Sequence, residues 1–350
     1  MASAAIWWIR RDLRLADNPA LHAALETGRP VLPGLILDPA ILTSRDLGAP
    51  RVAFLTRCLA SLDDDLRARG SRLIIRSGRP AEVLGRLVHE ADAPLISAEA
   101  DVSPYARRRD ADAARDLPLR LIEGGSVHSP DEVRKADGDT YTVFTPYRRA
   151  WLSRPLPGPR QLLPAPSRLA PAPSIASLPL PEAVEDVPHE PFPAGEAAAQ
   201  ARLREFTGDG GAIYNYAEGR DRLDWDGTSR LSPCLHFGLL SPRQAVVAAL
   251  QARDRAPDRP SREAAETWLS ELVWREFFRA VLFHTPYVRR RSFRGDLRSI
   301  RWENDPASYA AWCEGRTGVP VVDAAMRQLR TTGWMHNRAR MITASYLVKD

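Results

Sequence analysis

Two segments of the chain combine aromatic rings, polar hydrogen-bonding groups and arginine at helical spacing. One set follows the spacing i, i+3, i+7 and i+10 and comprises Trp268, Glu271, Arg275 and Phe278. The other set follows i, i+3, i+4 and i+7 and comprises Trp334, Asn337, Arg338 and Met341. Each set is therefore predicted to share one face of a helix. Such a face is costly to bury unless every polar atom has a partner, so the pattern favours a pocket for a flat, partly anionic molecule with polar edges.

A third segment, Gly227–Pro233, places hydroxyl residues directly before a predicted helical stretch over 234–250. Hydroxyl groups, free backbone N–H groups and the positive end of a helix together suit a diphosphate. An ordinary helix cap uses the same residue types and is the alternative. The first segment is open in the same way, because Glu271 and Arg275 also match the i, i+4 pair of a solvated helix and its tryptophans could belong to a core.

Arginines also gather between these segments, in a stretch interleaved with Phe293 and Trp302. Its members are Arg289, Arg290, Arg291, Arg294, Arg298 and Arg301. Such a stretch can follow a phosphate backbone, although a solvated basic loop has the same composition. The net charge of +5 and the pI of about 9.3 favour anionic partners such as nucleic acid. With almost no lysine and 30 prolines, however, the arginine excess also fits a GC-rich coding bias.

The composition is that of a globular chain long enough for two domains. Its 350 residues are 44% hydrophobic, and no apolar run approaches the roughly 20 residues of a membrane span. The run Ala4–Ile9 leads into Arg10–Arg11 and predicts a buried strand, not a signal peptide. Three widely separated cysteines fit a reducing cytoplasm, and seven histidines lack metal-ligand spacing, so we expect a cytoplasmic protein without a metal. The sequence has no Ser/Cys–His nucleophile motif, Walker loop or H-E-x-x-H, which argues against hydrolases and nucleoside triphosphatases.

Residues 1–130 alternate short apolar runs with helical patterns. The runs lie at 5–9, 31–37, 72–76, 94–97 and 119–122 and are rich in Ile, Leu and Val, as buried parallel strands are. Asn18–Pro19 predicts a helix start with Gly28 as its stop, and a second helix is predicted over 52–66. The alternation predicts a doubly wound, Rossmann-like α/β domain. The first strand leads into Arg10–Asn18 without G-x-G-x-x-G, so we expect a scaffold that holds no dinucleotide in the usual way.

The rest of the chain divides into a connector and an all-α domain. We assign 131–195 to the connector, because 12 prolines fall within 154–193 and predict an extended path over the surface. From 196 to 350 the patterns are helical, with no convincing strand. An apolar helical pattern is still running at Leu347–Asp350 without a Gly or Pro stop, so we expect this domain to be truncated.

With these segments assembled, the chain closely resembles the photolyase/cryptochrome family, most of all the microbial class I cyclobutane pyrimidine dimer photolyases. The resemblance covers nearly all of the sequence. It implies an α/β antenna-type domain followed by a helical domain that binds FAD and DNA. The motifs that carry it, in the family's order, are Trp8–Arg14 with Asp17–Asn18, Val143–Tyr147, Thr228–Ser232, Trp274–Phe277, Gly318–Arg327 and Thr332–Arg338.

The resemblance implies a carbon–carbon lyase that uses light to repair pyrimidine dimers in UV-damaged DNA. Fully reduced FAD, folded into a U, would donate an electron to a dimer flipped out of the duplex and later recover it. The residues implied to hold the flavin are Tyr216, Thr228, Ser229, Arg230, Leu231, Ser232, Trp268, Asn337 and Arg340. Those implied to line the dimer cavity and act in catalysis are Glu271, Trp274, Asn337 and Met341. Arg220, Arg275 and Arg338, together with Glu271, Trp274 and Asn337 of the cavity, are implied to contact DNA. Trp302 matches the surface end of the family's tryptophan electron chain.

Two positions bear on the substrate and on the antenna. Asn337 follows His336 where (6-4) photolyases typically carry a second histidine, which favours the cyclobutane dimer as substrate. Tyr105–Ala106 replace an amide and a carboxylate with which some relatives contact a folate, so the resemblance does not identify an antenna chromophore. It also leaves open a cryptochrome-like blue-light photoreceptor and an inactive, truncated relative. We expect a monomer without membrane association.

Overall fold

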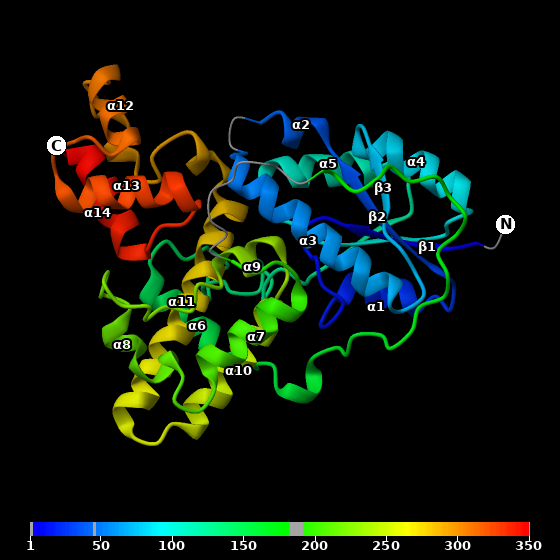
Figure 1. The fold of residues 1–350 in the computed structure, drawn as a ribbon, viewed down its shortest axis with the longest axis horizontal. Coiled ribbons are helices and arrows are strands. Elements are labelled where there is room, and N and C mark those ends of the chain that lie inside the picture. Colours follow the sequence, from blue (N-terminus) through cyan, green and yellow to red (C-terminus); the bar gives the residue numbers. More distant parts are fainter. Residues whose placement is uncertain (1–2, 45–46, 183–191, 350) are drawn as a thin grey trace.

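The computed structural model describes residues 3–44, 47–182 and 192–349, and its two parts lie side by side (Figure 1). The first part is a parallel sheet covered by helices. Its strands are β1 (Ala5–Ile9), β2 (Val31–Leu37), β3 (Ile74–Ser77), β4 (Ile96–Glu99) and β5 (Leu119–Ile122). Their spatial order is β3-β2-β1-β4-β5, so the predicted doubly wound fold is confirmed. Each predicted apolar run forms a strand within about two residues of its expected bounds.

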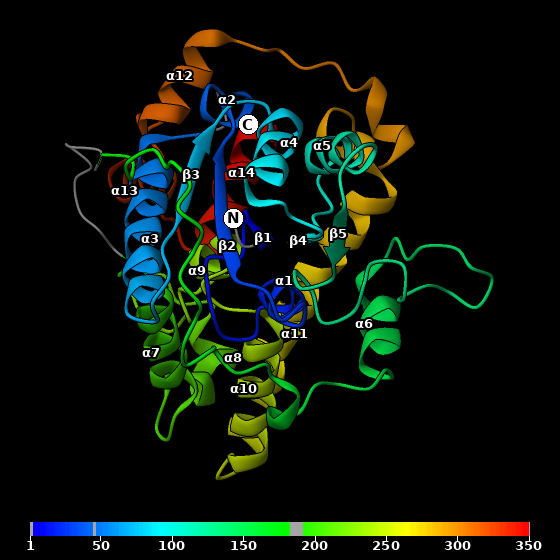
Figure 2. The same ribbon diagram turned by 90° about the vertical axis from the view of Figure 1, so that its right-hand side faces the viewer.

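The alternation of side chains along β1 separates two cores. Its odd-numbered residues share one core with α1 (Pro19–Leu25) and α3 (Ala49–Arg67), and this core continues into the helical part of the chain. Its even-numbered residues share the other core with α4 (Pro80–Ala91) and α5 (Pro104–Ala114). Figure 2 shows α3 on one face of the sheet and α4 with α5 on the other. A short helix, α2 (Pro39–Leu42), follows β2.

The predicted signals for the first helix are confirmed at both ends. The side-chain oxygen of Asn18 accepts a hydrogen bond from the Leu21 N–H at 2.9 Å, and Pro19 is the first helical residue. Gly28 follows the helix with a φ of +69°, a conformation that favours glycine. The second predicted helix is α3, which begins at Ala49 and ends before Gly70.

The second part is helical, and among the described residues no strand follows β5, as predicted. Its helices are α6 (Phe144–Leu152), α7 (Glu196–Thr207), α8 (Tyr216–Gly219), α9 (Ser232–Phe237), α10 (Pro242–Arg255), α11 (Arg259–His284), α12 (Pro306–Glu314), α13 (Pro320–Thr332) and α14 (Asn337–Lys349). The longest, α11, spans 26 residues and packs against α6, α8 and α10. Helix α6 thus lies within the segment predicted as the connector but packs on the helical part, where the ring of Tyr147 lies 5.2 Å from that of Phe277. The stretch after α6 follows the α/β part in an extended path (Figure 1), with residues 183–191 outside the described ones.

A glycine divides the helical stretch predicted over 234–250. Gly238 takes a φ of +70° and ends α9, and a capping box formed by Ser241 and Gln244 starts α10. The predicted helical stretch is therefore made of two helices joined by a short turn. Gly238 also lies so close to the first part of the chain that a Cβ there would fall 1.9 Å from the carbonyl oxygen of Arg11. Only glycine allows this approach between the two parts.

A second glycine separates residues that were expected to share one helix face. Gly333 takes a φ of +70° and ends α13, and α14 begins only at Asn337. The start of α14 is held by His336, whose Nδ1 accepts a hydrogen bond from the Arg338 N–H at 3.1 Å. The prediction that Trp334 lies on the same helix as Asn337 is therefore wrong, because a turn intervenes.

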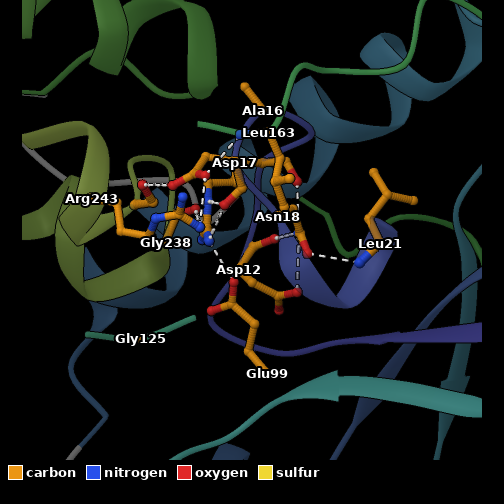
Figure 3. Close-up of polar contacts among 12 residues, drawn as sticks. Asp12, Ala16, Asp17, Asn18, Leu21, Glu99, Gly125, Leu163, Gly238 and Arg243 are labelled. Atoms are coloured by element: carbon orange, nitrogen blue, oxygen red, sulfur yellow. Dashed lines mark hydrogen bonds and ion pairs between the residues drawn. The ribbon is translucent and has the colours of Figure 1, made fainter. Parts of the chain in front are cut away.

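The segment Arg10–Asn18, which follows β1, joins the two parts of the chain, and we call it the clamp loop (Figure 3). Arg14 is only 1% exposed. Its guanidinium donates to the carbonyl oxygen of Asp17 at 2.9 Å and to that of Gly238 at 3.2 Å, and it pairs with the Glu99 carboxylate. Gly238 belongs to the helical part, so a single buried side chain ties that part to β4.

Asp17 extends this connection. Its carboxylate accepts hydrogen bonds from the Ser241 hydroxyl at 2.5 Å and from the Leu163 N–H at 3.1 Å, and it lies 3.4 Å from Arg243. Ser241 and Arg243 start α10, while Leu163 belongs to the proline-rich stretch. Glu196 of α7 also accepts hydrogen bonds from the backbone of the clamp loop. The clamp loop thus fixes the helical part on the sheet through hydrogen bonds and ion pairs.

The buried carboxyl group of Glu99 predicts a pH dependence of stability. Burial raises the pKa of Glu99 from 4.5 to about 7, and this effect outweighs the lowering by Arg14. Between these two pH values the Glu99 carboxyl group therefore keeps its proton in the folded chain and loses it in the unfolded chain. The resulting stabilisation is complete below pH 4.5 and is lost as the pH rises through about 7. Between about pH 5 and pH 8, we expect the wild-type chain to lose roughly 1–3 kcal/mol more unfolding free energy than the Glu99→Gln variant.

Urea unfolding at the two pH values measures this difference. Glu82→Gln, which removes an exposed carboxylate of α4, is the matched control and should keep the wild-type profile. Parallel pH profiles for the wild type and Glu99→Gln would contradict the prediction.

Candidate functional site

The residues predicted to hold a diphosphate gather at one place. Gly219 at the end of α8 and Gly227 lie backbone to backbone, and a Cβ on Gly227 would fall 2.8 Å from the Cα of Gly219. This contact brings α8, which carries Tyr216, against the segment Thr228–Ser232. The sequence spacing could not show this proximity, because it depends on two glycines from different elements.

An arginine of α7 fixes the same segment from behind. The Arg202 guanidinium donates to the carbonyl oxygen of Ser229 at 3.1 Å and to that of Thr228 at 3.0 Å. Arg230 takes a φ of +53°, and its guanidinium lies 5.0 Å from the centre of the Trp334 ring. Leu231 occupies the cap position of α9, and no side chain caps that helix. The alternative of an ordinary helix cap therefore fails.

The chemistry of this segment fits an anionic diphosphate. It offers three hydroxyl side chains, those of Thr228, Ser229 and Ser232, near the guanidinium of Arg230, which pairs with the exposed Asp226 carboxylate at 2.9 Å. Hydroxyl and guanidinium groups are the donors that bind phosphate oxygens in proteins. Since α9 has only six residues, these side chains rather than a long helix dipole account for the fit.

Trp268 lies in the core beneath this segment. It is 3% exposed, and its ring centre lies 5.1 Å from that of Phe206. Phe206 in turn lies 5.9 Å from Tyr216, and burial raises the pKa of the Tyr216 hydroxyl. The core alternative is therefore correct for Trp268, although its cluster of rings reaches α8.

Four charged side chains form one group, which we call the ionic group: Arg220 and Asp221, which directly follow α8, Glu271 of α11 and Arg338 of α14. The Glu271 carboxylate of α11 accepts a hydrogen bond from Arg220 at 2.7 Å. The Asp221 carboxylate accepts one from Nε of Arg338 at 2.5 Å and lies 3.7 Å from Nε of Arg220. Arg338 also reaches the sulfur of Met341 at 3.4 Å. The structure thus brings together four residues that were expected to meet a substrate or DNA, namely Arg220, Glu271, Arg338 and Met341. Asp221 joins them although it was not predicted.

Arg275 is turned away from this group. Its guanidinium donates to the carbonyl oxygens of Gly125 at 3.0 Å and Leu235 at 3.3 Å, so it crosses the boundary between the two parts. Burial and the neighbouring Arg279 lower the pKa of Arg275 to about 10. The i, i+4 pair with Glu271 is not formed, because Glu271 is paired with Arg220. In this position the Arg275 guanidinium is bonded to backbone carbonyl oxygens, and its expected contact with DNA stays a prediction.

Trp274 stands one helical turn beyond Glu271 and has aromatic neighbours of its own. The Phe144 ring of α6 stacks on it with centres 3.6 Å apart and planes inclined by 7°. Phe278 lies further along α11 at 5.5 Å and 22°, and it is 61% exposed. Phe144 therefore covers one face of the indole. Phe278 was expected on the same face as Trp268, yet one ring is in solvent and the other in the core.

The other predicted residues of α14, and those of the stretch before α12, lie mostly in solvent. Asn337, Arg340 and Met341 are exposed on α14, and Arg340 donates to the carbonyl oxygen of Met335 at 3.2 Å. Trp302 is exposed before α12, as a surface tryptophan should be. The arginine-rich stretch around it is solvated for most of its length, with Arg298 placed over the Tyr287 ring. In the α/β part, the Tyr105 hydroxyl donates to Asp38.

The described residues contain neither a cluster of metal-ligating side chains nor a membrane-spanning helix. Within 3–44, 47–182 and 192–349, no three His, Cys, Asp or Glu side chains are grouped as a metal site requires. No helix in the same ranges is both long and apolar enough to cross a bilayer.

Sequence reasoning missed three residues that shape the site. Arg202 lies 26 residues before Thr228 and has no motif around it. Asp221 directly follows Arg220, but its partner Arg338 is 117 residues away. Phe144 belongs to the motif Val143–Tyr147. Its spacing of i, i+3 and i+7 with Tyr147 and Trp151 places three aromatic rings on one helix face, which was the available signal for packing on α11.

Comparison with known proteins agrees with this architecture. The family model "DNA photolyase" matches residues 5–167, and "FAD binding domain of DNA photolyase" matches residues 268–350. A deoxyribodipyrimidine photo-lyase from Synechococcus is 38% identical, and the alignment covers 100% of this chain and 75% of that protein. The crystal structure of a class III photolyase from Agrobacterium tumefaciens superposes with a TM-score of 0.86 at 32% identity, covering 100% and 73% of the two chains. A Synechocystis cryptochrome superposes at 0.87 with 27% identity, covering 99% and 75%.

The contact between Gly219 and Gly227 predicts a specific intolerance. The Gly227→Ala variant must separate the segment from α8, because its Cβ would lie 2.8 Å from the Gly219 Cα. We expect it to lose about 1–3 kcal/mol of unfolding free energy, as overpacked sites do. Gly295→Ala, where a Cβ meets nothing within 4 Å, is the control and should stay within about 0.5 kcal/mol of the wild type. Denaturant unfolding of both variants tests this, and equal stabilities would contradict it.

Proposed function

Since the chain belongs to the DNA photolyase family, we propose that it repairs cyclobutane pyrimidine dimers in UV-damaged DNA with light. The observation that carries the proposal is the ionic group beside Met341 and one helical turn from Trp274. A carboxylate, two guanidinium groups and an aromatic ring at one place suit a substrate with polar base edges and flanking phosphates. We propose that the protein acts as a monomer in the cytoplasm.

The proposal assigns the flavin to the segment described above. Tyr216 and Thr228–Ser232 would hold the diphosphate of FAD, with Arg202 keeping the segment in place. Trp268 would support it from the core, and Asn337 and Arg340 would approach it from α14. When bound and fully reduced, FAD would supply the electron that opens the dimer, which is chemistry no side chain here can provide.

The chain's own residues would bind and orient the lesion. A dimer inside the duplex is inaccessible, so it must be flipped out, and its weakened pairing makes this easier. A base could stack on Trp274 only where Phe144 and Phe278, whose ring centres lie 3.6 and 5.5 Å from that of the indole, leave it uncovered. Such stacking contributes about 1–3 kcal/mol per base. Glu271 would hydrogen-bond the polar edge of the dimer, while Met341 would give an apolar contact. Arg220 and Arg338 would meet the neighbouring phosphates.

Asn337 supports the choice of substrate. A histidine at this position would serve proton transfer, which dimer splitting does not need, and the buried His336 next to it is used to start α14. Trp302 is exposed, so it suits the outer end of an electron path that restores the reduced flavin.

A blue-light photoreceptor is the second candidate, because one of the similar solved structures is a cryptochrome. It would bind flavin in the same place but leave dimers intact. A light-dependent change in partner binding without repair would favour it over the enzyme.

The repair activity is testable with one variant. We expect the wild-type protein with reduced flavin to remove a thymine dimer from an oligonucleotide under blue light and not in the dark. Trp274→Ala should weaken dimer binding roughly tenfold to a hundredfold, which corresponds to the loss of about 1–3 kcal/mol of stacking. Dimer loss is followed by chromatography of the digested oligonucleotide, and binding by fluorescence anisotropy.

The control keeps the chemistry of the substitution but moves it away from the site. Tyr309→Ala removes an exposed ring of α12 and should leave binding and repair unchanged. Intact dimers after illumination of the wild type with stoichiometric reduced flavin would rule out the proposed function.

A further inference from the structure

We propose that Asp221 is a specificity-determining residue that couples the dimer cavity to the DNA backbone. In this proposal, Asp221 neutralises Arg338 while the cavity is empty, and it shifts to Arg220 when Glu271 turns to a dimer. Arg338 then becomes available to a phosphate. The inference rests on the proposed function, because it assigns Glu271 to the lesion and Arg338 to the backbone.

The geometry gives Asp221 two possible partners. Its carboxylate bonds Nε of Arg338 at 2.5 Å, and Nε of Arg220 lies only 3.7 Å away. Arg220 is held on its other side by Glu271 at 2.7 Å. The two carboxylates therefore share two guanidinium groups, and a small movement of Asp221 changes which of them it serves.

The exposure of these groups makes the exchange easy. Asp221 is 54% exposed and Arg338 is 32% exposed, whereas Arg220 and Glu271 are more enclosed. Exposed ion pairs are weak and are screened by salt, so a phosphate can replace the Asp221 carboxylate on Arg338. When Glu271 leaves the more enclosed Arg220, by contrast, the partly buried charge of Arg220 needs a new partner. Asp221 is the nearest carboxylate that can provide it.

The exchange makes phosphate binding depend on the lesion. With undamaged DNA, Glu271 stays with Arg220, and a phosphate must compete with Asp221 for Arg338. With a flipped dimer, Glu271 engages the base edge, Asp221 moves to Arg220 and Arg338 is released. The same carboxylate thus weakens binding to intact duplex and permits full binding to damaged duplex, which is specificity by an unfavourable contact with the wrong partner.

Asp221→Asn removes the charge and keeps the size of the side chain. We expect affinity for undamaged duplex to rise roughly fivefold, the equivalent of about 1 kcal/mol, while affinity for dimer-containing duplex changes less. The slope of log affinity against log salt for undamaged duplex should steepen by about 0.9, because one more phosphate is contacted. Both quantities are measured in the dark by fluorescence anisotropy with the purified protein and two oligonucleotides that differ only in the dimer.

Two further variants separate this role from a general charge effect. Asp224→Asn removes an equal charge three positions along the chain from a carboxylate that pairs with Arg222 at 2.6 Å, and the ratio of the two affinities should stay at the wild-type value. In an Arg338→Gln background, Asp221→Asn should give no further gain for undamaged duplex, because the arginine it releases is absent.

The outcomes distinguish this inference from the function beneath it. Equal gains for both duplexes, an unchanged salt slope, or a gain that persists without Arg338 would overturn the role of Asp221 alone. A wild-type protein with no preference for dimer-containing duplex would overturn the proposed function and this coupling with it.

Discussion

The buried guanidinium of Arg14 is the interaction on which the arrangement of the two parts depends. A guanidinium has five N–H donors and keeps its charge in the interior, so it must find several acceptors there. Arg14 finds them in Glu99 at the end of β4, in its own clamp loop and in Gly238 of the helical part. The placement of α9 next to the sheet brings all three within reach of one side chain. The missing Cβ of Gly238 is the steric counterpart of this requirement, since any side chain there would meet the Arg11 carbonyl oxygen.

Helix α11 carries this constraint from the domain boundary to the candidate site. Its Glu276 is buried and accepts hydrogen bonds from the Val127 N–H at 2.5 Å and the Trp151 ring N–H at 2.6 Å. Arg275 beside it reaches the carbonyl oxygens of both parts of the chain. These contacts fix the rotation of the helix, and with it the directions of Trp274, which directly precedes Arg275, and of Glu271, about one turn earlier. The face of α11 that we propose to meet the lesion is therefore oriented by side chains that bond to other parts of the protein, which is typical of a site carried on a rigid element.

The sequence predicted those features that depend on local physics. The apolar runs became strands and Asn18 became a cap, because burial and capping act within a few residues. Helix ends at Gly238 and Gly333 were missed, since a glycine interrupts a helical pattern only when the chain needs a left-handed turn at that point. The partner of Glu271 was also missed. Spacing suggested Arg275, four residues away, whereas the structure supplies Arg220 from the turn after α8 and engages Arg275 across the domain boundary. Long-range pairing of this kind has no periodicity in the sequence.

The same contrast explains why overall charge says little about the DNA surface. The chain has 49 basic and 44 acidic residues, so most positive charge can be matched internally and a net charge of +5 gives only the class of partner. Burial divides the arginines into two kinds. Arg14 and Arg275 are enclosed and bonded to backbone carbonyls, and their removal from those partners would leave an uncompensated charge inside the fold. Arg338 is held by an exposed carboxylate, in a pair weak enough for a phosphate to replace. Burial, and not number, thus separates the arginines that maintain the fold from those that a ligand can recruit.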